Sequence, residues 1–355
     1  TDVEEAEPMA RINGSPISAA LCMDVSMTSA ARIRLAEQVF ALAAHAYGAP
    51  LEYVDLALTQ FWESPGEEAT FQQLNYWLAR CSRPICETQP PCSFRIMPRV
   101  LGTAREALLM AQSVAAISLT SVTDNPVYLL PNKQLPLGKA ISTGGYHNAQ
   151  ATPAIDTLNA RFADLCTLAD RQTMALHSAT HLPESLARPG GKHWGTVLLS
   201  FLQVGYGEEA RHAAQRTFLP MSEGGGIAGQ NDVASPTTLS YRKHMKAAFC
   251  LESALTLLAV SASQAYYATD RKPPRRLDPL LAMVRQRVRP VRSRSTRHLG
   301  KELGKLRRAF EKHIQSSLRG DQSSCAHRRL VVIGDASAGP RLSRGLSGWH
   351  IRPTR

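Results

Sequence analysis

Three stretches of the sequence gather polar side chains between apolar segments, where a loop can present them to a ligand. They are Ile12-Asn13-Gly14, the run from Gln89 to Arg95, and the run from Ser142 to Asn148. Arg95 stands between Phe94 and Ile96, so its guanidinium either reaches the surface or meets an anion in a partly desolvated place. A planar guanidinium can hold a carboxylate through two parallel hydrogen bonds. Arg95 is therefore a candidate carboxylate ligand, and an ordinary surface arginine is the alternative.

Two further loop features have a functional and a purely structural interpretation. The pair Gly144-Gly145 lets a backbone approach a ligand closely, but it is also a common turn. Thr123-Asp124-Asn125-Pro126 could belong to a site, but a residue before proline is disfavoured in the helical conformation, so this element could simply end a helix. Taken singly, neither feature decides between a site and a turn.

Helical periodicity dominates the segments that must position these loops. Apolar residues recur at spacings of three and four over residues 99–119, 149–177 and 235–268, which predicts three long helices, the last capped by Ser235-Pro236. Ala111 with Ala115, and Ala254 with Ala259, leave room for neighbouring helices to approach closely. Strand-like alternation is scarce. We therefore predict an all-α fold, a long antiparallel helix bundle with Gly- and Pro-rich loops that carry the chemistry.

The net charge of +12 is unevenly distributed along the chain. Residues 271–355 hold 22 Lys and Arg against 5 Asp and Glu, whereas residues 1–270 hold 19 against 24. We predict a helical domain over 1–291, a terminal helix over 292–317 and a basic, disordered tail over 318–355. Residues 301–313 can form a basic amphipathic helix, so attachment to nucleic acid or an acidic membrane is the alternative to a packed last helix. We predict that nucleic acid is not a partner.

Composition bounds the setting of the protein. A hydrophobic fraction of 44% is enough for a sizeable core, and no uninterrupted apolar run approaches the roughly 20 residues of a membrane span. No export signal is visible at the start of the chain, and the seven cysteines form no Cys-x-x-Cys pair, which favours a reducing, cytoplasmic setting. The eleven histidines are scattered singly, so we predict no metal site and no membrane association.

The order of these elements is more informative than any one of them. Asn13-Gly14, Gln89 with Arg95, Thr123-Asp124-Asn125-Pro126, Gly144-Gly145 and Gln230-Asn231-Asp232 follow one another between long helices. In this order they resemble the histidine and aromatic amino acid ammonia-lyase family. The resemblance runs from Ala10 to Val291, about four-fifths of the chain.

The resemblance implies an enzyme that eliminates ammonia from an aromatic α-amino acid and leaves an α,β-unsaturated acid. It implies a homotetramer and an electrophile, methylidene-imidazolone, that the family makes from its own Ala-Ser-Gly. It implies that Arg95 binds the substrate carboxylate. It places Asn13 and Gln89 where the family orients the electrophile and the substrate. It makes His147 and Asn231 substrate-binding residues. An aminomutase of the same family and an inactive pseudoenzyme or helical scaffold are the alternatives.

The sequence departs from the family pattern at several of these positions. Cys92 replaces the usual Tyr, and Tyr146-His147 replaces the usual Asn-Phe. Asn231 stands where histidine-specific members carry Glu, so no carboxylate is available to pair with an imidazole, which argues against histidine as the substrate. The 355 residues contain no contiguous Ala-Ser-Gly. A truncated record, a degenerate copy and a split enzyme completed by another polypeptide are three explanations.

Overall fold

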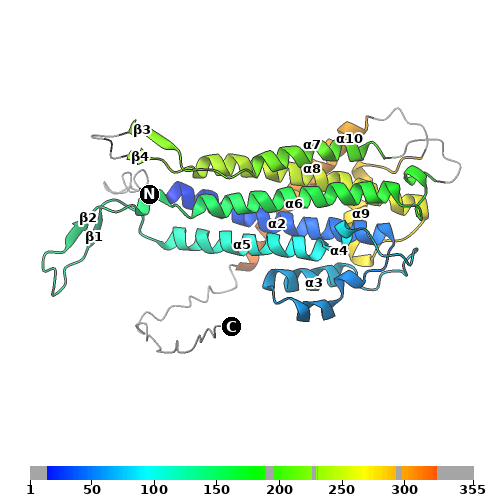
Figure 1. The fold of residues 1–355 in the computed structure, drawn as a ribbon, viewed down its shortest axis with the longest axis horizontal. Coiled ribbons are helices and arrows are strands. Elements are labelled where there is room, and N and C mark those ends of the chain that lie inside the picture. Colours follow the sequence, from blue (N-terminus) through cyan, green and yellow to red (C-terminus); the bar gives the residue numbers. More distant parts are fainter. Residues whose placement is uncertain (1–13, 189–195, 226–228, 230, 293–297, 326–355) are drawn as a thin grey trace, which may run out of the picture. The chain divides into compact units, whose positions relative to one another are not determined.

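The computed structural model describes residues 14–188, 196–225, 229, 231–292 and 298–325, and helices dominate it (Figure 1). One compact unit extends to Leu318, and the chain beyond it forms a second unit. Five helices of the first unit lie side by side and make up its bundle. They are α2 (Pro16–Tyr47), α5 (Met97–Thr120), α6 (Ala151–Ser178), α7 (Leu199–Ala213) and α8 (Thr237–Thr269).

The bundle is antiparallel, as predicted. In Figure 1, α2, α6 and α8 run in one direction along the bundle, and α5 and α7 run in the other. The predicted helices over 99–119, 149–177 and 235–268 are α5, α6 and α8, each within two residues at both ends. The cap that the sequence predicts for α8 is wrong in its detail. The helix begins at Thr237, and its cap residue, Pro236, makes no side-chain capping hydrogen bond.

Shorter elements connect the bundle helices or pack beside them. Two antiparallel hairpins interrupt loops that the sequence analysis left without strands; Val127 pairs with Ile141 in the first and Gly225 with Asn231 in the second. The helices are α3 (Pro65–Trp77), α4 (Cys92–Arg95), α9 (Asp278–Arg287) and α10 (Leu299–Cys325), with short 3-10 turns at Glu52–Val54, Leu56–Phe61, Gly145–His147, Glu184–Leu186 and Arg275–Leu277. The strands are β1 (Val127–Leu129), β2 (Lys139–Ile141), β3 (Met221–Gly225) and β4 (Asn231–Val233).

Helix α2 was not predicted because it is buried around most of its circumference. It packs against α3, α5, α6 and α8, so its small and apolar residues form no single stripe of helical period. Its ends nevertheless carry ordinary signals in the sequence. Pro16 occupies the first turn, and Gly48 ends the helix in the left-handed conformation at φ 86°.

Small residues bring the helices close together. Ala111, Ala115, Ala254 and Ala259 are all fully buried, so each of them faces neighbouring parts of the bundle. Helices α3 and α5 approach even more closely through glycine, since a Cβ on Gly102 would lie 2.8 Å from the Cα of Glu67. Only a residue without a side chain fits there.

Polar side chains also lie within the bundle, and several of them pair with one another across helices. Glu252 on α8 pairs with Arg32 on α2 at 2.9 Å and with Arg307 on α10 at 3.3 Å. His244 Nδ1 lies 2.8 Å from Asn159 Oδ1. These contacts cross between helices, so they select one register of packing among helices whose apolar surfaces are otherwise similar.

The last helix packs on the bundle. Leu306, Phe310 and Ile314 of α10 are buried in the main core, which confirms the packed-helix interpretation and leaves this apolar face unavailable to a membrane or a nucleic acid. The helix differs from its predicted bounds of 292–317, because it begins at Leu299 and continues to Cys325. The rest of the predicted tail, 326–355, lies outside the described residues.

Helices α5 and α8 are long and apolar enough to cross a membrane by length and composition alone, although neither is an uninterrupted apolar run. In α8, 83% of the most apolar window is buried among the other helices, as expected of a core helix. The corresponding share of α5 is 39%, so much of its apolar surface faces outward.

Buried histidines make the stability of the fold sensitive to acid. Burial, helped by nearby arginines, lowers the pKa of His45 to about 4 and that of His244 to about 3. Between these values and the ordinary pKa of 6.5, the unfolded chain binds protons that the folded chain does not, so stability falls as the pH drops. Burial raises the pKa of Glu37 from 4.5 to about 7. The folded chain therefore binds the extra proton over this range, so Glu37 makes the fold more stable as the pH drops from 7 to 4.5.

We expect His244→Gln to weaken the acid sensitivity. Between pH 7 and pH 5 the variant should lose about 2 kcal/mol less unfolding free energy than the unsubstituted chain, because one titrating group is gone. Urea unfolding at the two pH values measures this difference. His313→Gln, at an exposed position on α10, is the control and should retain the full pH dependence. Equal slopes for the His244 variant and the control would contradict the prediction.

Candidate active site

Arg95 and the segment at Ser15, which follows the predicted Asn13, lie at opposite ends of α5. Arg95 ends α4, immediately before α5 begins at Met97. Asn13 itself lies outside the described residues, but the backbone N–H of Ser15 donates to Thr123 Oγ1 at 3.0 Å, just past the other end of α5. A helix of 24 residues is about 36 Å long. Arg95 and Ser15 of one chain therefore lie far apart.

Arg95 is exposed on a well-anchored platform. Its Nε donates to the carbonyl of Pro90 at 3.1 Å, which fixes the orientation of the guanidinium. The neighbouring Phe94 is fully buried, with its ring centroid 4.7 Å from that of Tyr47. Gln172 Nε2 of α6 donates to the carbonyl of Ser93 at 2.9 Å. The backbone that carries Arg95 is thus held by both the core and α6.

Gln89 and Cys92 are exposed beside Arg95. The segment that leads to them is tied to the end of α2 by Arg271, whose guanidinium donates to the carbonyl of His45 at 2.7 Å and to Ser82 Oγ at 3.0 Å. The Ile85 N–H donates to the carbonyl of Gly48 at 2.7 Å. Sequence reasoning missed Arg271, because its partners lie about 190 and 226 positions away in the chain.

At the other end of the bundle, the Thr-Asp-Asn-Pro element clamps the glycine loop. Asn125 Oδ1 accepts the backbone N–H of Thr143 at 2.8 Å and the hydroxyl of Ser142 at 3.2 Å. Thr143 Oγ1 in turn accepts the N–H of Gly145 at 3.2 Å. The element is therefore more than a helix stop, because its amide fixes a loop 18 residues further along.

The other two predicted substrate-binding positions, 147 and 231, lie at this same loop end. His147 is half-buried, and its Nε2 lies 3.2 Å from the carbonyl oxygen of Ala234. Ala234 directly follows β4, the strand that begins at Asn231. The side chain of Asn231 is not among those described. Residues 147 and 231 are thus brought near one another within one chain, at the end opposite Arg95.

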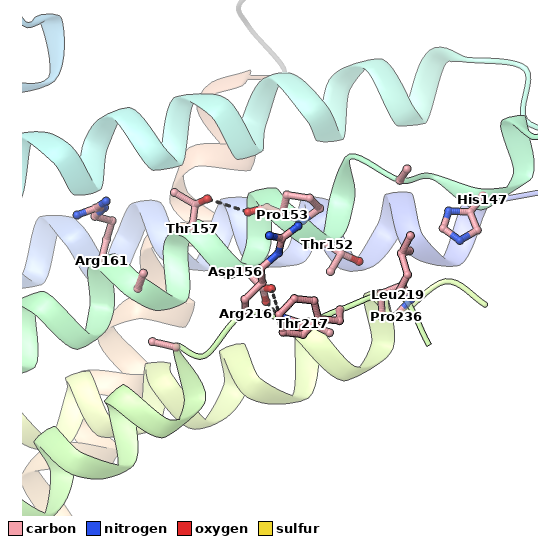
Figure 2. Close-up of a pocket in the computed structure, with 14 residues that line it drawn as sticks. His147, Thr152, Pro153, Asp156, Thr157, Arg161, Arg216, Thr217, Leu219 and Pro236 are labelled. Carbon is pink, nitrogen blue, oxygen red and sulfur yellow. Dashed lines mark hydrogen bonds between the residues drawn. The ribbon is translucent and has the colours of Figure 1, made fainter. Parts of the chain in front are cut away.

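A pocket of about 700 Å³ opens beside His147, between the first turns of α6 and the segment after α7 (Figure 2). Asp156, on α6, ties its two walls together. Its carboxylate accepts the N–H of Thr217 at 2.6 Å, the Thr217 hydroxyl at 3.0 Å and the hydroxyl of Ser240 at 2.5 Å. Sequence reasoning missed Asp156, although a carboxylate beside the apolar residues Ile155 and Leu158 was a usable signal.

No group of three or more His, Cys, Asp and Glu side chains that could hold a metal ion occurs in the described part of the chain.

Comparisons with known proteins identify the family. The model of the aromatic amino acid lyase family matches residues 1–290. The chain belongs to this family. A curated relative, the histidine ammonia-lyase of Aromatoleum aromaticum, is 27% identical over 296 residues, which are 79% of this chain and 54% of that protein. The chain thus spans about half the length of the curated relatives it matches.

Solved structures show that this member of the aromatic amino acid lyase family shares its fold with other proteins. The histidine ammonia-lyase of Trypanosoma cruzi superposes with a TM-score of 0.75 at 20% identity, over 88% of this chain and 59% of that one. The tyrosine aminomutase of Streptomyces globisporus gives 0.76 at 18% identity, over 90% and 65%. The predicted all-α fold and family resemblance are confirmed. The roles given to Asn13, Gln89, Arg95, His147 and Asn231 stay predictions.

The clamp at Asp156 should contribute strongly to the stability of this chain. We expect Asp156→Ala to lower the free energy of unfolding by about 1 to 3 kcal/mol, because the buried N–H of Thr217 loses its acceptor. Urea unfolding monitored by circular dichroism measures the loss. Asp164→Ala, which removes an exposed partner of Arg161, should cost no more than about 1 kcal/mol. Similar losses in the two variants would rule out a special role for the clamp.

Proposed function

We propose that this chain supplies the substrate-carboxylate part of an ammonia-lyase site for an aromatic α-amino acid. The observation that carries the proposal is the anchored platform of Arg95 in a member of the aromatic amino acid lyase family. A guanidinium fixed at Nε still has its other N–H groups to offer a carboxylate. In the elimination, a base removes a β-proton of the amino acid, the carbon–nitrogen bond breaks, and ammonia and the α,β-unsaturated acid leave.

The residues of the platform have distinct parts in this proposal. Arg95 holds the substrate carboxylate and so fixes which β-hydrogen faces the base. Gln89, on the same platform, orients the bound substrate. Methylidene-imidazolone, when present, supplies the electrophile that makes the amine a leaving group. Asn13 would contact it at the loop end, where space is available, because a Cβ on Gly144 would meet nothing within 4 Å.

Assembly of several chains is part of the proposal. The positions of Arg95 and Ser15 at opposite ends of α5 call for an antiparallel neighbour, whose platform would reach this chain's loop end. Large apolar side chains on the outer faces of α5 and α7 offer the surface for such a neighbour. They are Leu109, Met110, Ile117 and Leu119 on α5, and Phe201, Leu202 and Val204 on α7. We infer a homotetramer, as the resemblance implies.

The substrate is proposed from the side chains at the loop end. Asn231 offers a neutral amide, which favours a phenylalanine- or tyrosine-type substrate over histidine, although the curated relatives include histidine ammonia-lyases. An aminomutase would begin with the same elimination and return ammonia to the β-carbon. The six described cysteines are free, and we propose a reducing, cytoplasmic setting.

The source of the electrophile tests the proposal as a whole. If the coding sequence reads in frame through an Ala-Ser-Gly upstream, the longer chain should convert phenylalanine or tyrosine to an arylacrylate, which absorbs in the near ultraviolet. A second polypeptide that supplies Ala-Ser-Gly and restores the same activity would also support the proposal. A start codon at Met9 together with no activity in any such combination would support the inactive relic instead.

In an active form, Arg95→Lys should keep the charge but lose the two-pronged geometry. We expect a loss of about 1 to 3 kcal/mol of transition-state stabilisation in kcat/KM, the order of a charge-assisted hydrogen bond. Much of it should appear as a higher KM, because the carboxylate is held in both the ground and the transition state. Arg99→Lys, one turn along α5, is the matched control and should leave kcat/KM unchanged. Unchanged kinetics in the Arg95 variant for every aromatic amino acid would refute its role.

Separation of the two ends predicts complementation between chains. Asn13→Ala and Arg95→Gln variants should each be inactive, and a mixed assembly of the two should recover part of the activity, because some sites then combine intact residues from both chains. The double variant mixed with Arg95→Gln should recover nothing. Failure to recover activity in assemblies shown by native mass spectrometry to contain both variants would mean that the site does not combine these residues across chains.

A further inference from the structure

We propose that the pocket between α6 and residues 214–219 is a second carboxylate site, which binds an organic acid with an aromatic or aliphatic body. It is the pocket of Figure 2, at the end of the bundle opposite Arg95. Its volume of about 700 Å³ lies within the usual range for a small-molecule site. The proposal requires neither the electrophile nor a completed lyase site, but the pocket shares His147 with the substrate-binding positions of the proposed function.

Arg216 supplies the positive charge. In Figure 2 its side chain extends from the segment after α7 toward the first turns of α6, and it lines the pocket. Its guanidinium carbon lies 5.2 Å from the ring centroid of Phe218. No carboxylate among the described residues pairs with it. A guanidinium without an anion, next to an apolar wall, is suited to bind an incoming carboxylate.

The acidic groups nearby are already engaged. Asp156 accepts three hydrogen bonds, all from Thr217 and Ser240. Asp164 pairs with Arg161 at 2.9 Å. Lys243 adds a further positive charge behind the wall, where its Nζ donates to Thr217 Oγ1 at 2.9 Å. The local balance of charge therefore favours an anion at Arg216.

The rest of the lining calls for an apolar body on the ligand. Pro153, Phe218, Leu219 and Pro236 contribute to the walls, together with short alanine and threonine side chains. Phe218 and Leu219 are 71% and 61% exposed, so they offer apolar surface that a bound ligand can cover. A ligand with a planar ring and one carboxylate would cover them and pair with Arg216. Inorganic anions lack the apolar part and would bind more weakly.

Calorimetric titration of the full chain with trans-cinnamate, as a probe of this class, tests the proposal. We expect saturable binding, and binding of the neutral trans-cinnamamide at least about tenfold weaker, because the amide lacks the charge-assisted bond to Arg216. Arg216→Gln should weaken cinnamate binding to the level of the amide. Arg242→Gln, the same charge change at an exposed position outside the lining, is the control and should bind cinnamate as the unsubstituted chain does.

Other variants separate this site from the proposed lyase site. Arg95→Gln should leave cinnamate binding unchanged. Loss of binding in Arg95→Gln but not in Arg216→Gln would overturn the second site while supporting the proposed function. No saturable binding, or equal affinity for the acid and the amide, would overturn the second site alone. Because Arg216 is exposed, Arg216→Gln should keep the circular dichroism spectrum and the thermal midpoint of the unsubstituted chain. Arg95→Gln must pass the same check.

Discussion

The length of α5 is the constraint on which the functional organisation depends. A helix of about 36 Å separates the arginine platform from the clamped glycine loop. The same length exposes apolar surface on α5 and α7 that a single chain leaves in water. Both features fit the proposed assembly, in which an antiparallel neighbour would cover the apolar faces and place one chain's Arg95 beside the other's loop end.

Rigidity at the two ends has different origins. At the platform, Phe94 is anchored in the core, and Gln172 and Arg271 hold the adjoining backbone from α6 and from the chain just beyond α8. At the loop end the polar groups hold one another, through Asn125 and Asp156. Hydrogen bonds replace an apolar anchor there because the loop backbone must satisfy its own N–H groups without a helix or sheet. Both arrangements fix the backbone before any ligand binds, which lowers the entropy cost of binding.

The sequence predicted the helices that bury one face, because such burial leaves an apolar period in the sequence. Helices α5, α6 and α8 show a clear apolar period, so their bounds were found within two residues. Helix α2 has no such period because neighbours surround it, and the hairpins are only three to five residues long per strand. The candidate site residues were found by their order along the chain. Their separation in space could not be found in that way, because motif order carries no information about which end of a helix a loop occupies.

Asp156 links the stability of the fold to the proposed second site. Its carboxylate closes the contact between α6, α8 and the segment of residues 214–219, and that segment presents Arg216 to the pocket. If the contact opened, the carboxylate of Asp156 would lose its hydrogen-bond donors and Arg216 would lose its defined position. Opening would therefore destabilise the fold and disrupt the pocket at the same time. A bound carboxylate would favour the closed form by the same linkage and stabilise the fold. The pocket therefore depends on a buried polar contact as well as on its apolar walls.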